Sequence, residues 1–134
     1  MAALAAAGGA ALISMVANYS KGKSKSKAVE NKIKGILKAS EKARKRLIEL
    51  VDLDAKAYMG VVKARGKSKA AQKRAAKEAV DVPKEVSRIC FDLTQLTPFL
   101  VQKGNQNLIS DVIIAVDLLF AAFNSARVNV EANS

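Results

Sequence analysis

Gly104-Asn105-Gln106-Asn107-Leu108-Ile109-Ser110-Asp111 opens the last segment of the chain, and an apolar run from Val112 to Val130 follows it. The polar octapeptide is typical of a turn that leads into a helix. The run after it is apolar on nearly every side, which predicts a central, buried helix. A polar seam nevertheless recurs along it every seven residues, at Ser110, Asp117, Asn124 and Glu131. We expect this polar seam to meet a partner, a ligand or water.

The rest of the chain is predicted to surround this helix. With 134 residues it is long enough for one domain, and half of the residues are apolar. The uncharged, small-residue segment 2–18 predicts a closely packed buried helix rather than a signal peptide or a membrane span. Apolar residues that recur about every 3.5 positions predict a long amphipathic helix over 28–64. A third helix is predicted over 69–103, capped by Ser68 and kinked or divided at Pro83 and Pro98.

These four helical blocks predict an all-α bundle of long antiparallel helices. The last helix needs more cover than three neighbours provide, so we also expect a homodimer. The chain carries a formal charge of +11, and the segment from Tyr19 to Arg74 alone holds 18 basic and five acidic residues. That excess is typical of a surface facing nucleic acid, an anionic membrane or an anionic small molecule.

The numbers of histidine and cysteine residues limit the kinds of catalysis and metal binding that are possible. The sequence contains no histidine, which excludes histidine-based general base catalysis and histidine metal sites. The single cysteine, Cys90, forms no internal disulfide, which predicts a reducing, cytoplasmic location. Cys90 falls on the apolar stripe of the third helix, where a core position is the simpler interpretation.

Two carboxylates are the candidates for chemistry. Asp54 falls on the apolar stripe of the long helix, so it is predicted to face inward, where it needs a pocket or a cationic partner. Asp111 opens the last helix, where the helix dipole alone favours a carboxylate by about 0.3–1 kcal/mol. Pairing with a lysine and simple helix capping therefore remain alternatives for Asp54 and Asp111.

Several segments, taken in order, resemble the cyclodeaminase and methenyltetrahydrofolate cyclohydrolase family of folate enzymes. They are Ala3–Val16, Met15–Asn18 leading to Lys21-Gly22-Lys23, Asp52–Tyr58, Val82–Val86, Gly104–Asn107 with Ser110-Asp111, and Asn124 with Arg127–Val130 and Asn133. The resemblance covers essentially the whole chain and implies a single helical domain over residues 1–134. Members carry a glycine-rich turn before the first helix and further helical residues after the last segment. We therefore expect this chain to be trimmed at both ends.

The resemblance implies an enzyme that closes or opens the methenyl bridge of tetrahydrofolate, as a cyclodeaminase or a cyclohydrolase. The substrate is a tetrahydrofolate derivative, and no metal is expected. Both reactions need proton transfers, for which Asp111 and Asp54 are the catalytic candidates. The opening of the last helix is expected to face Asp54. The substrate-binding candidates are Lys21 and Lys23 for the anionic tail, and Asn107, Ser110, Asn124 and Asn129 for the ring and its surroundings.

Two other functions remain open at this stage. One is a non-catalytic helical dimer of the same fold, which the absent glycine-rich turn favours. The other is a basic bundle that binds nucleic acid, whose affinity would fall steeply with salt. Against nucleic acid, the basic loop after the first helix contains a single aromatic residue for stacking, Tyr19.

Overall fold

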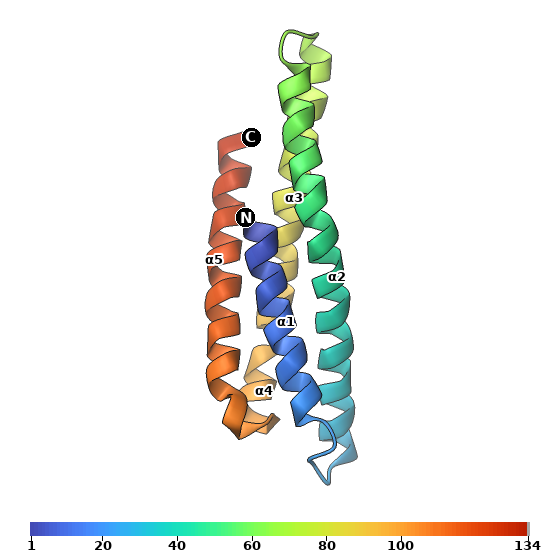
Figure 1. Cartoon of the computed structure of the whole chain (residues 1–134), viewed down its shortest axis with the longest axis vertical. Helices are drawn as coiled ribbons and strands as arrows, with labels where there is room; N and C mark the ends of the chain where they lie inside the picture. Colours follow the sequence, from blue (N-terminus) through green and yellow to red (C-terminus); the bar gives the residue numbers. More distant parts are fainter. Residues whose placement is uncertain (134) are drawn as a thin grey trace.

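The computed structural model describes residues 1–133, which form an antiparallel bundle of helices (Figure 1). The elements are α1 (Ala2–Ser20), α2 (Lys27–Ala64), α3 (Lys69–Thr94), α4 (Thr97–Lys103), the short 3-10 turn η1 (Gln106–Leu108) and α5 (Ile109–Asn133). Residues 1–133 contain no strand. The predicted all-α bundle of long antiparallel helices is confirmed.

The helix ends follow from local chemistry. The Ser26 and Ser68 hydroxyls accept hydrogen bonds from the backbone N–H groups of Val29 (3.3 Å) and Ala71 (3.2 Å), so each serine caps the helix that follows it. Pro98 lies in the first turn of α4, where its missing N–H costs nothing, and α3 ends just before it. Pro83 lies inside α3 without ending it, so of the two prolines only Pro98 divides the predicted third helix.

The bundle has a defined order of helices around its axis. Both α1 and α3 contact α2 on one side and α5 on the other, so α2 and α5 occupy opposite corners (Figure 1). Small residues let α1 approach α5 closely. A Cβ atom added to Gly9 would lie 2.9 Å from Leu119 Cγ and 3.2 Å from the carbonyl oxygen of Ala115. This close contact fixes where α5 runs along α1.

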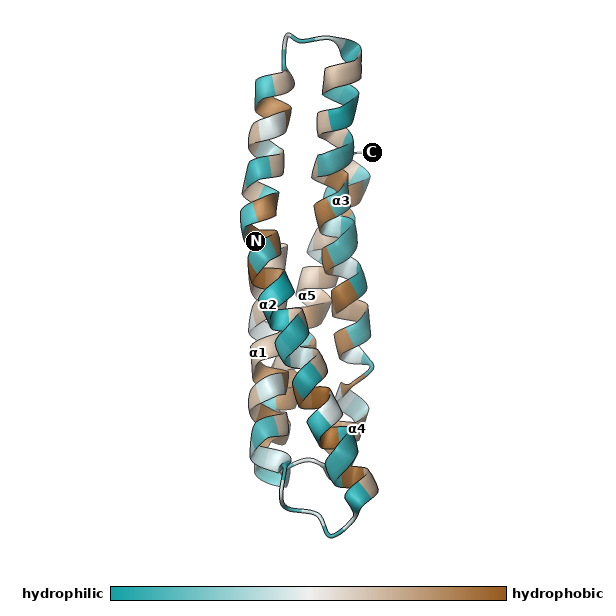
Figure 2. Cartoon of the chain, turned by 90° about the vertical axis from the view of Figure 1, so that its right-hand side faces the viewer, coloured by the Kyte–Doolittle hydropathy of each residue, from teal (hydrophilic) through white to brown (hydrophobic). Residues whose placement is uncertain are grey.

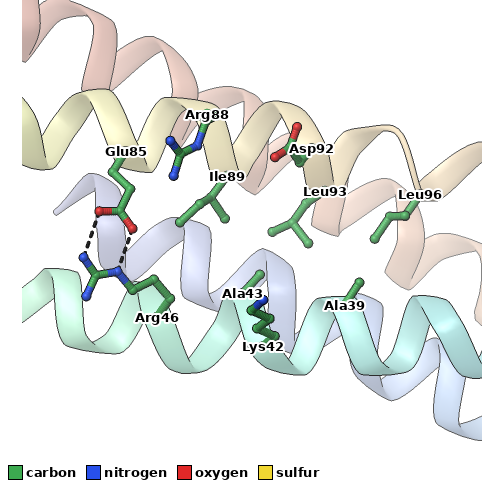
Figure 3. A pocket seen from close by; sticks show the side chains of 10 residues that line it. All are labelled: Ala39, Lys42, Ala43, Arg46, Glu85, Arg88, Ile89, Asp92, Leu93 and Leu96. Atoms are coloured by element: carbon green, nitrogen blue, oxygen red, sulfur yellow. Dashed lines mark hydrogen bonds and ion pairs between the residues drawn. The ribbon is translucent and has the colours of Figure 1, made fainter.

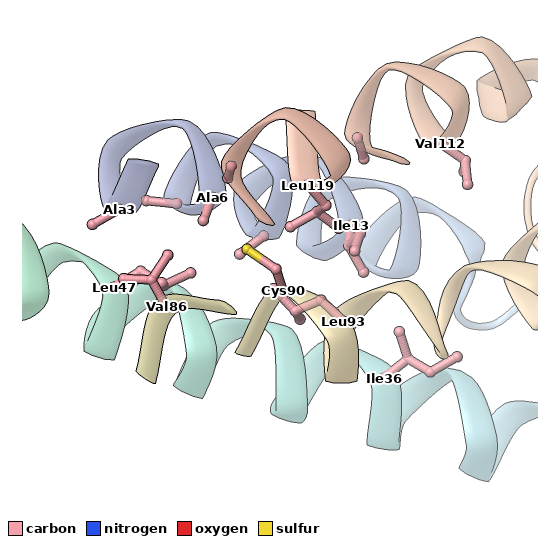
Figure 4. Packing of buried hydrophobic residues seen from close by; sticks show 14 of the residues in the cluster. Ala3, Ala6, Ile13, Ile36, Leu47, Val86, Cys90, Leu93, Val112 and Leu119 are labelled. Atoms are coloured by element: carbon pink, nitrogen blue, oxygen red, sulfur yellow. The ribbon is translucent and has the colours of Figure 1, made fainter. Parts of the chain in front are cut away.

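The core lies between these four helices, and one side chain from each meets its neighbours there (Figure 4). Ile13 of α1, Leu47 of α2 and Leu119 of α5 are fully buried, and so is Cys90 of α3. The predicted core position of Cys90 is therefore confirmed. Burial also raises the pKa of its thiol to about 11, which keeps the thiol protonated and unreactive.

The hairpin made by α2 and α3 continues past the ends of α1 and α5 (Figures 1 and 2). With 38 residues, α2 is twice as long as α1, which has 19. The last part of α2 therefore packs against α3 alone, and Tyr58 is 63% exposed there although it continues the apolar stripe. Gly66, at φ +80°, makes the tight turn at the tip.

The last helix differs from its prediction. We expected α5 to be central and buried on all sides, but it lies at a corner of the bundle and buries one face only, through Val112, Ala115, Leu119, Ala122 and Ala126. Its opposite face leaves Ile113, Ile114, Phe120 and Val128 half exposed or more. Of the long helices only α1 and α3 pack against α5, so the sequence pattern overstated its burial. By length and hydropathy, α1 and the stretch 106–133 also resemble membrane spans. Half of the α1 stretch is buried within the bundle, whereas only 22% of the 106–133 stretch is buried.

Candidate functional site

The predicted site residues fall into two groups at opposite ends of α1. Asp54 and Asn129 lie at its beginning, beside Ala2 and Ala3. Lys21, Lys23, Asn107, Ser110 and Asp111 lie toward its end, where α1 gives way to the basic loop and α5 begins. A helix of 19 residues is about 28 Å long. The expectation that the opening of α5 faces Asp54 within one chain is therefore wrong.

Asp54 and Asn129 share a small cleft at the start of α1. Val82, Pro83 and Val86 of α3 complete its walls together with Ala2 and Ala3. The cleft has room for about one water molecule, about 10 Å³. Asp54 is exposed rather than inward-facing, because α2 has already passed the end of α1 at this point. A carboxylate beside a side-chain amide at an apolar wall is suited to hold and move a proton on a bound molecule.

The other end of α1 is held together by hydrogen bonds. The buried Ser20 hydroxyl donates to the carbonyl oxygen of Val16 (2.6 Å) and accepts from the backbone N–H of Asn105 (2.8 Å). The Asn105 side chain then accepts from the backbone N–H of Asn107 (3.0 Å), which sets the turn before α5. Asp111 is half-buried in the first turn of α5. The turn-like character of this stretch is as predicted.

The basic loop beside this end is more ordered than its composition indicated. The Glu30 carboxylate accepts hydrogen bonds from the backbone N–H groups of Gly22 (2.6 Å) and Ser24 (2.8 Å). These bonds hold the pKa of Glu30 below its ordinary value, the Gly22 bond having the largest effect. Gly22 has a φ of +77°, which favours glycine. Lys21 and Lys23, on either side of it, remain exposed and are presented to solvent at a defined place.

Asn124 belongs to neither group. It lies on the exposed face of α5 with Ser110 and Asp117, so the polar seam seen in the sequence points away from the core. The large exposed apolar side chains of α5 border this seam on the same face.

A groove between α2 and α3 was not predicted from the sequence. It has a volume of about 450 Å³, in the range of small-molecule sites, and an apolar floor (Figure 3). Arg46 spans it and donates two hydrogen bonds, of 2.6 and 2.8 Å, to the Glu85 carboxylate. This pairing holds the pKa of Glu85 below its ordinary value, so the carboxylate stays ionised near neutral pH and is a poor proton donor. Lys42, Arg88 and Asp92 line the same groove. The groove is thus an open hollow crossed by an ion pair.

Helical spacing held a weak signal for this groove. Lys42 and Arg46 are four residues apart on α2, and Glu85, Arg88 and Asp92 share one face of α3. Because cations are abundant along α2, this spacing does not by itself distinguish a groove from a solvated helix face. No group of three potential metal ligands of the His, Cys, Asp or Glu type was found within residues 1–133.

The chain is an all-helical bundle whose first helix is built of small residues, with a carboxylate and an amide at the start of that helix. The sequence model of the formiminotransferase-cyclodeaminase family matches residues 1–134, and the chain belongs to this family.

Two relatives give the comparison more detail. The chain is 38% identical over 143 aligned positions to a methenyltetrahydrofolate cyclohydrolase of Methylorubrum extorquens, an alignment covering 99% of this chain and 69% of the relative. Its fold matches the crystal structure of a formiminotetrahydrofolate cyclodeaminase from Thermotoga maritima with a TM-score of 0.93 and 37% identity. That match covers 98% of this chain and 67% of the other. The resemblance to this family inferred from the sequence is confirmed.

Proposed function

We propose that this protein is an enzyme of folate one-carbon metabolism that makes or opens the methenyl bridge of a tetrahydrofolate derivative. Membership of the formiminotransferase-cyclodeaminase family over the whole chain is the observation that carries this proposal. The two compared relatives are named for these two activities, the hydrolysis of methenyltetrahydrofolate and the deamination of formiminotetrahydrofolate. The substrate class is therefore common to both directions of the chemistry.

The chemistry in both directions passes through a tetrahedral carbon. In the hydrolase direction, water adds to the methenyl carbon and loses a proton, one carbon–nitrogen bond breaks, and the released ring-side nitrogen takes up a proton. In the deaminase direction, a folate nitrogen attacks the formimino carbon and loses its proton. The former formimino nitrogen takes up a proton, its bond to that carbon breaks, and it leaves as ammonia. Each path needs a group that accepts and returns a proton, worth roughly 10²- to 10⁴-fold in rate. We assign this role to Asp54, in the cleft that it shares with Asn129, and retain Asp111, at the other end of α1, as the second candidate.

The charges of the substrate match the charges of these residues. The methenyl-bridged folate is positive at its reacting carbon and negative at its glutamate tail. Carboxylates at the carbon and lysines at the tail are thus both favourable. We assign Lys21 and Lys23 to the tail, Asn129 to the ring beside Asp54, and Asn107 and Ser110 to the surroundings of the substrate at the other end of α1. Asn124 faces away from both groups, and its predicted contact with the substrate rests on the resemblance alone. Carboxylates, amides and water are sufficient for this chemistry, and we propose that it proceeds without a metal.

Two further features belong to the same proposal. We propose a homodimer, because a second copy would cover the exposed apolar face of α5. We also propose a cytoplasmic location, because the single cysteine is reduced and buried.

Two assays on the purified protein test the function and its direction. Hydrolysis is followed by the loss of the near-ultraviolet absorbance of methenyltetrahydrofolate. Deamination is followed by the gain of that absorbance from formiminotetrahydrofolate, with ammonia measured in parallel. We expect turnover in at least one assay. If the folded protein neither turns over nor binds either substrate, the non-catalytic dimer of the same fold becomes the better interpretation.

A further inference from the structure

The groove between α2 and α3 is a large hollow that the proposed folate chemistry does not use (Figure 3). Its volume of about 450 Å³ lies within the range of about 300–1,000 Å³ that is typical of small-molecule sites. The groove is separate from the Asp54 cleft. On α3 the cleft is walled by Pro83 and Val86, whereas the groove is lined by Glu85 and Ile89.

The charged side chains of the groove leave two cations without an anionic partner. Arg46 donates to the Glu85 carboxylate across the groove and to the Glu49 carboxylate on its own helix (2.9 Å), so its guanidinium is already occupied. Lys42 and Arg88 lie one turn away from this bridge, on the same side of it and on opposite walls. Both are exposed, and neither forms an ion pair with a carboxylate of residues 1–133. An anionic group bound there would gain two charged contacts.

The floor of the groove leaves apolar surface without cover. Ala43, Ile89 and Leu96 pack against the core from one side but are only partly buried, because their other side faces the groove (Figure 3). On the α2 wall the side chains are as small as Ala39 and Ala43, whereas the α3 wall carries larger ones. The space between them is therefore a shallow slot, which fits a flat apolar body.

Two bridges limit the length of this slot. Arg46 and Glu85 close one end. Beyond the other end Lys32, two turns before Ala39 on α2, covers the ring of Phe99 at 4.6 Å from its centroid. Arg46 and Ale39 are seven residues apart, which is about 10 Å along a helix. A helix of another protein would have to displace both bridges, so a short molecule fits the groove better.

We propose that this groove binds a small amphipathic anion, a molecule with a flat apolar body about 10 Å long and a single carboxylate group. The carboxylate lies between Lys42 and Arg88, whose guanidinium can bind it through two parallel hydrogen bonds. The apolar body lies over Ala39 and extends toward Leu96. Asp92 lines the same part of the groove and would repel a second anionic group, so the site selects a monoanion. The proposal goes beyond the folate chemistry and does not depend on it.

A titration with 2-naphthoate, followed by ¹H–¹⁵N NMR of the wild-type protein, tests the site directly. For a ligand of about 13 non-hydrogen atoms we expect a Kd on the order of 1 mM. The amide signals of Ala39, Ala43 and Ile89 should shift, and neutral 2-naphthamide should bind at least about threefold more weakly. Shifts confined to the exposed apolar face of α5 around Ile113 and Phe120, or equal binding of the amide, would overturn the proposal.

Two matched double variants test the charged contacts. Lys42→Gln/Arg88→Gln should weaken the binding of 2-naphthoate by about 3- to 10-fold and leave the binding of 2-naphthamide unchanged. Lys45→Gln/Lys84→Gln removes the same net charge from exposed neighbouring positions that do not line the groove, and should bind 2-naphthoate like the wild type. An equal loss in both variants would mean that only the overall positive charge attracts the anion, which contradicts a defined site.

Filling the slot tests the apolar contact. Ala39→Leu adds a larger side chain at an exposed position of the α2 wall, so the protein should fold normally by circular dichroism and bind both naphthalene compounds more weakly. Ala70→Leu, the same change at an exposed position of α3 outside the groove, is the control. Unchanged binding by Ala39→Leu would show that the ligand body lies elsewhere.

Competition distinguishes this site from the substrate site. Methenyltetrahydrofolate should not displace 2-naphthoate from the groove, and the Lys42→Gln/Arg88→Gln variant should turn over folate substrates at the wild-type rate. Displacement by the folate would make the groove part of the substrate site and overturn the proposal of a separate one. A wild-type protein without folate turnover would contradict the proposed function only, because the NMR titration does not depend on activity.

Discussion

Gly9 lies where α1 packs closely against α5, and replacing it with alanine tests the packing of the bundle. The added Cβ atom would lie 2.9 Å from Leu119 Cγ and 3.0 Å from its Cδ2. It would also lie 3.2 Å from the carbonyl oxygen of Ala115. Leu119 is fully buried and borders only the small hollow that it lines with Phe91 and Phe120, so either its side chain shifts toward this hollow or the helices separate slightly.

The expected size of this effect comes from two opposing contributions. Forcing an extra methyl group into a packed interior costs about 1–3 kcal/mol. Exchanging glycine for alanine within a helix returns about 1 kcal/mol. Because a backbone atom and a buried side chain both oppose the new methyl group, we expect the upper part of the cost. Gly9→Ala should therefore lower the free energy of unfolding by about 1–2 kcal/mol.

Gly35→Ala is the matched control. Gly35 also lies inside a helix, but a Cβ atom there would have no neighbour within 4 Å, so the substitution should stabilise the protein by about 0.5–1 kcal/mol. Urea unfolding followed by circular dichroism measures both variants at one protein concentration. If Gly9→Ala is as stable as Gly35→Ala, α1 and α5 do not approach each other as described here, and the position of α5 has to be revised.

Three further predictions concern single contacts. Ser20→Ala should destabilise the protein by about 1–3 kcal/mol, because it leaves the Asn105 N–H without its acceptor, and hydrogen exchange at Asn105 should become faster. Glu85→Gln should cost about 0.5–1 kcal/mol at pH 7 by weakening the bond to Arg46. The pKa of Glu85 is lowered in the folded state, so the stability difference between wild type and Glu85→Gln is present above about pH 4.5. It disappears as the pH falls through the lowered pKa. Urea titrations should therefore show the difference at pH 7 and a smaller one at pH 3. Cys90 should not react with a thiol reagent at pH 8 until the protein unfolds, since its pKa is raised to about 11; rapid labelling of the folded protein would contradict its burial.

The helices were largely predictable because their limits depend on local signals. Ser68, Gly66 and Pro98 mark the ends of helices through a side-chain cap, a positive φ and a missing N–H, and each of these acts within a few residues. The apolar stripes likewise placed Leu47 and Cys90 in the core. These signals lie in the sequence within a few residues of the helix ends or core positions that they determine.

The burial of α5 was not predictable in the same way. A helix that is apolar on all sides needs cover, but its sequence does not say whether the cover comes from the same chain. In this bundle α5 packs along its length against α1 and α3, with α4 and η1 touching it as well, so Phe120 and Ile113 remain on the surface. The polar seam was correctly identified, yet it faces outward from the bundle rather than into it.

The candidate site was predictable only in part. Helical periodicity states on which side of a helix a residue lies, but not what stands opposite it. Asp54 is 28 residues into α2, whereas Asp111 is in the first turn of α5, and these two helices run in the same direction from the same end of the bundle (Figure 1). Counting residues along both helices would have separated them. The proximity of Asp54 and Asn129 depends on where α1 begins, which the periodic pattern does not encode.

The most direct test of the central claim compares Asp54→Asn with Asp52→Asn. Both residues are exposed carboxylates on α2, but only Asp54 lines the cleft at the start of α1. In the methenyltetrahydrofolate and formiminotetrahydrofolate assays, Asp54→Asn should lower kcat/KM by roughly 10²- to 10⁴-fold. Asp52→Asn should leave it unchanged, and both variants should be as stable as the wild-type protein. Turnover by Asp54→Asn at the wild-type rate would contradict the assignment of this cleft to catalysis.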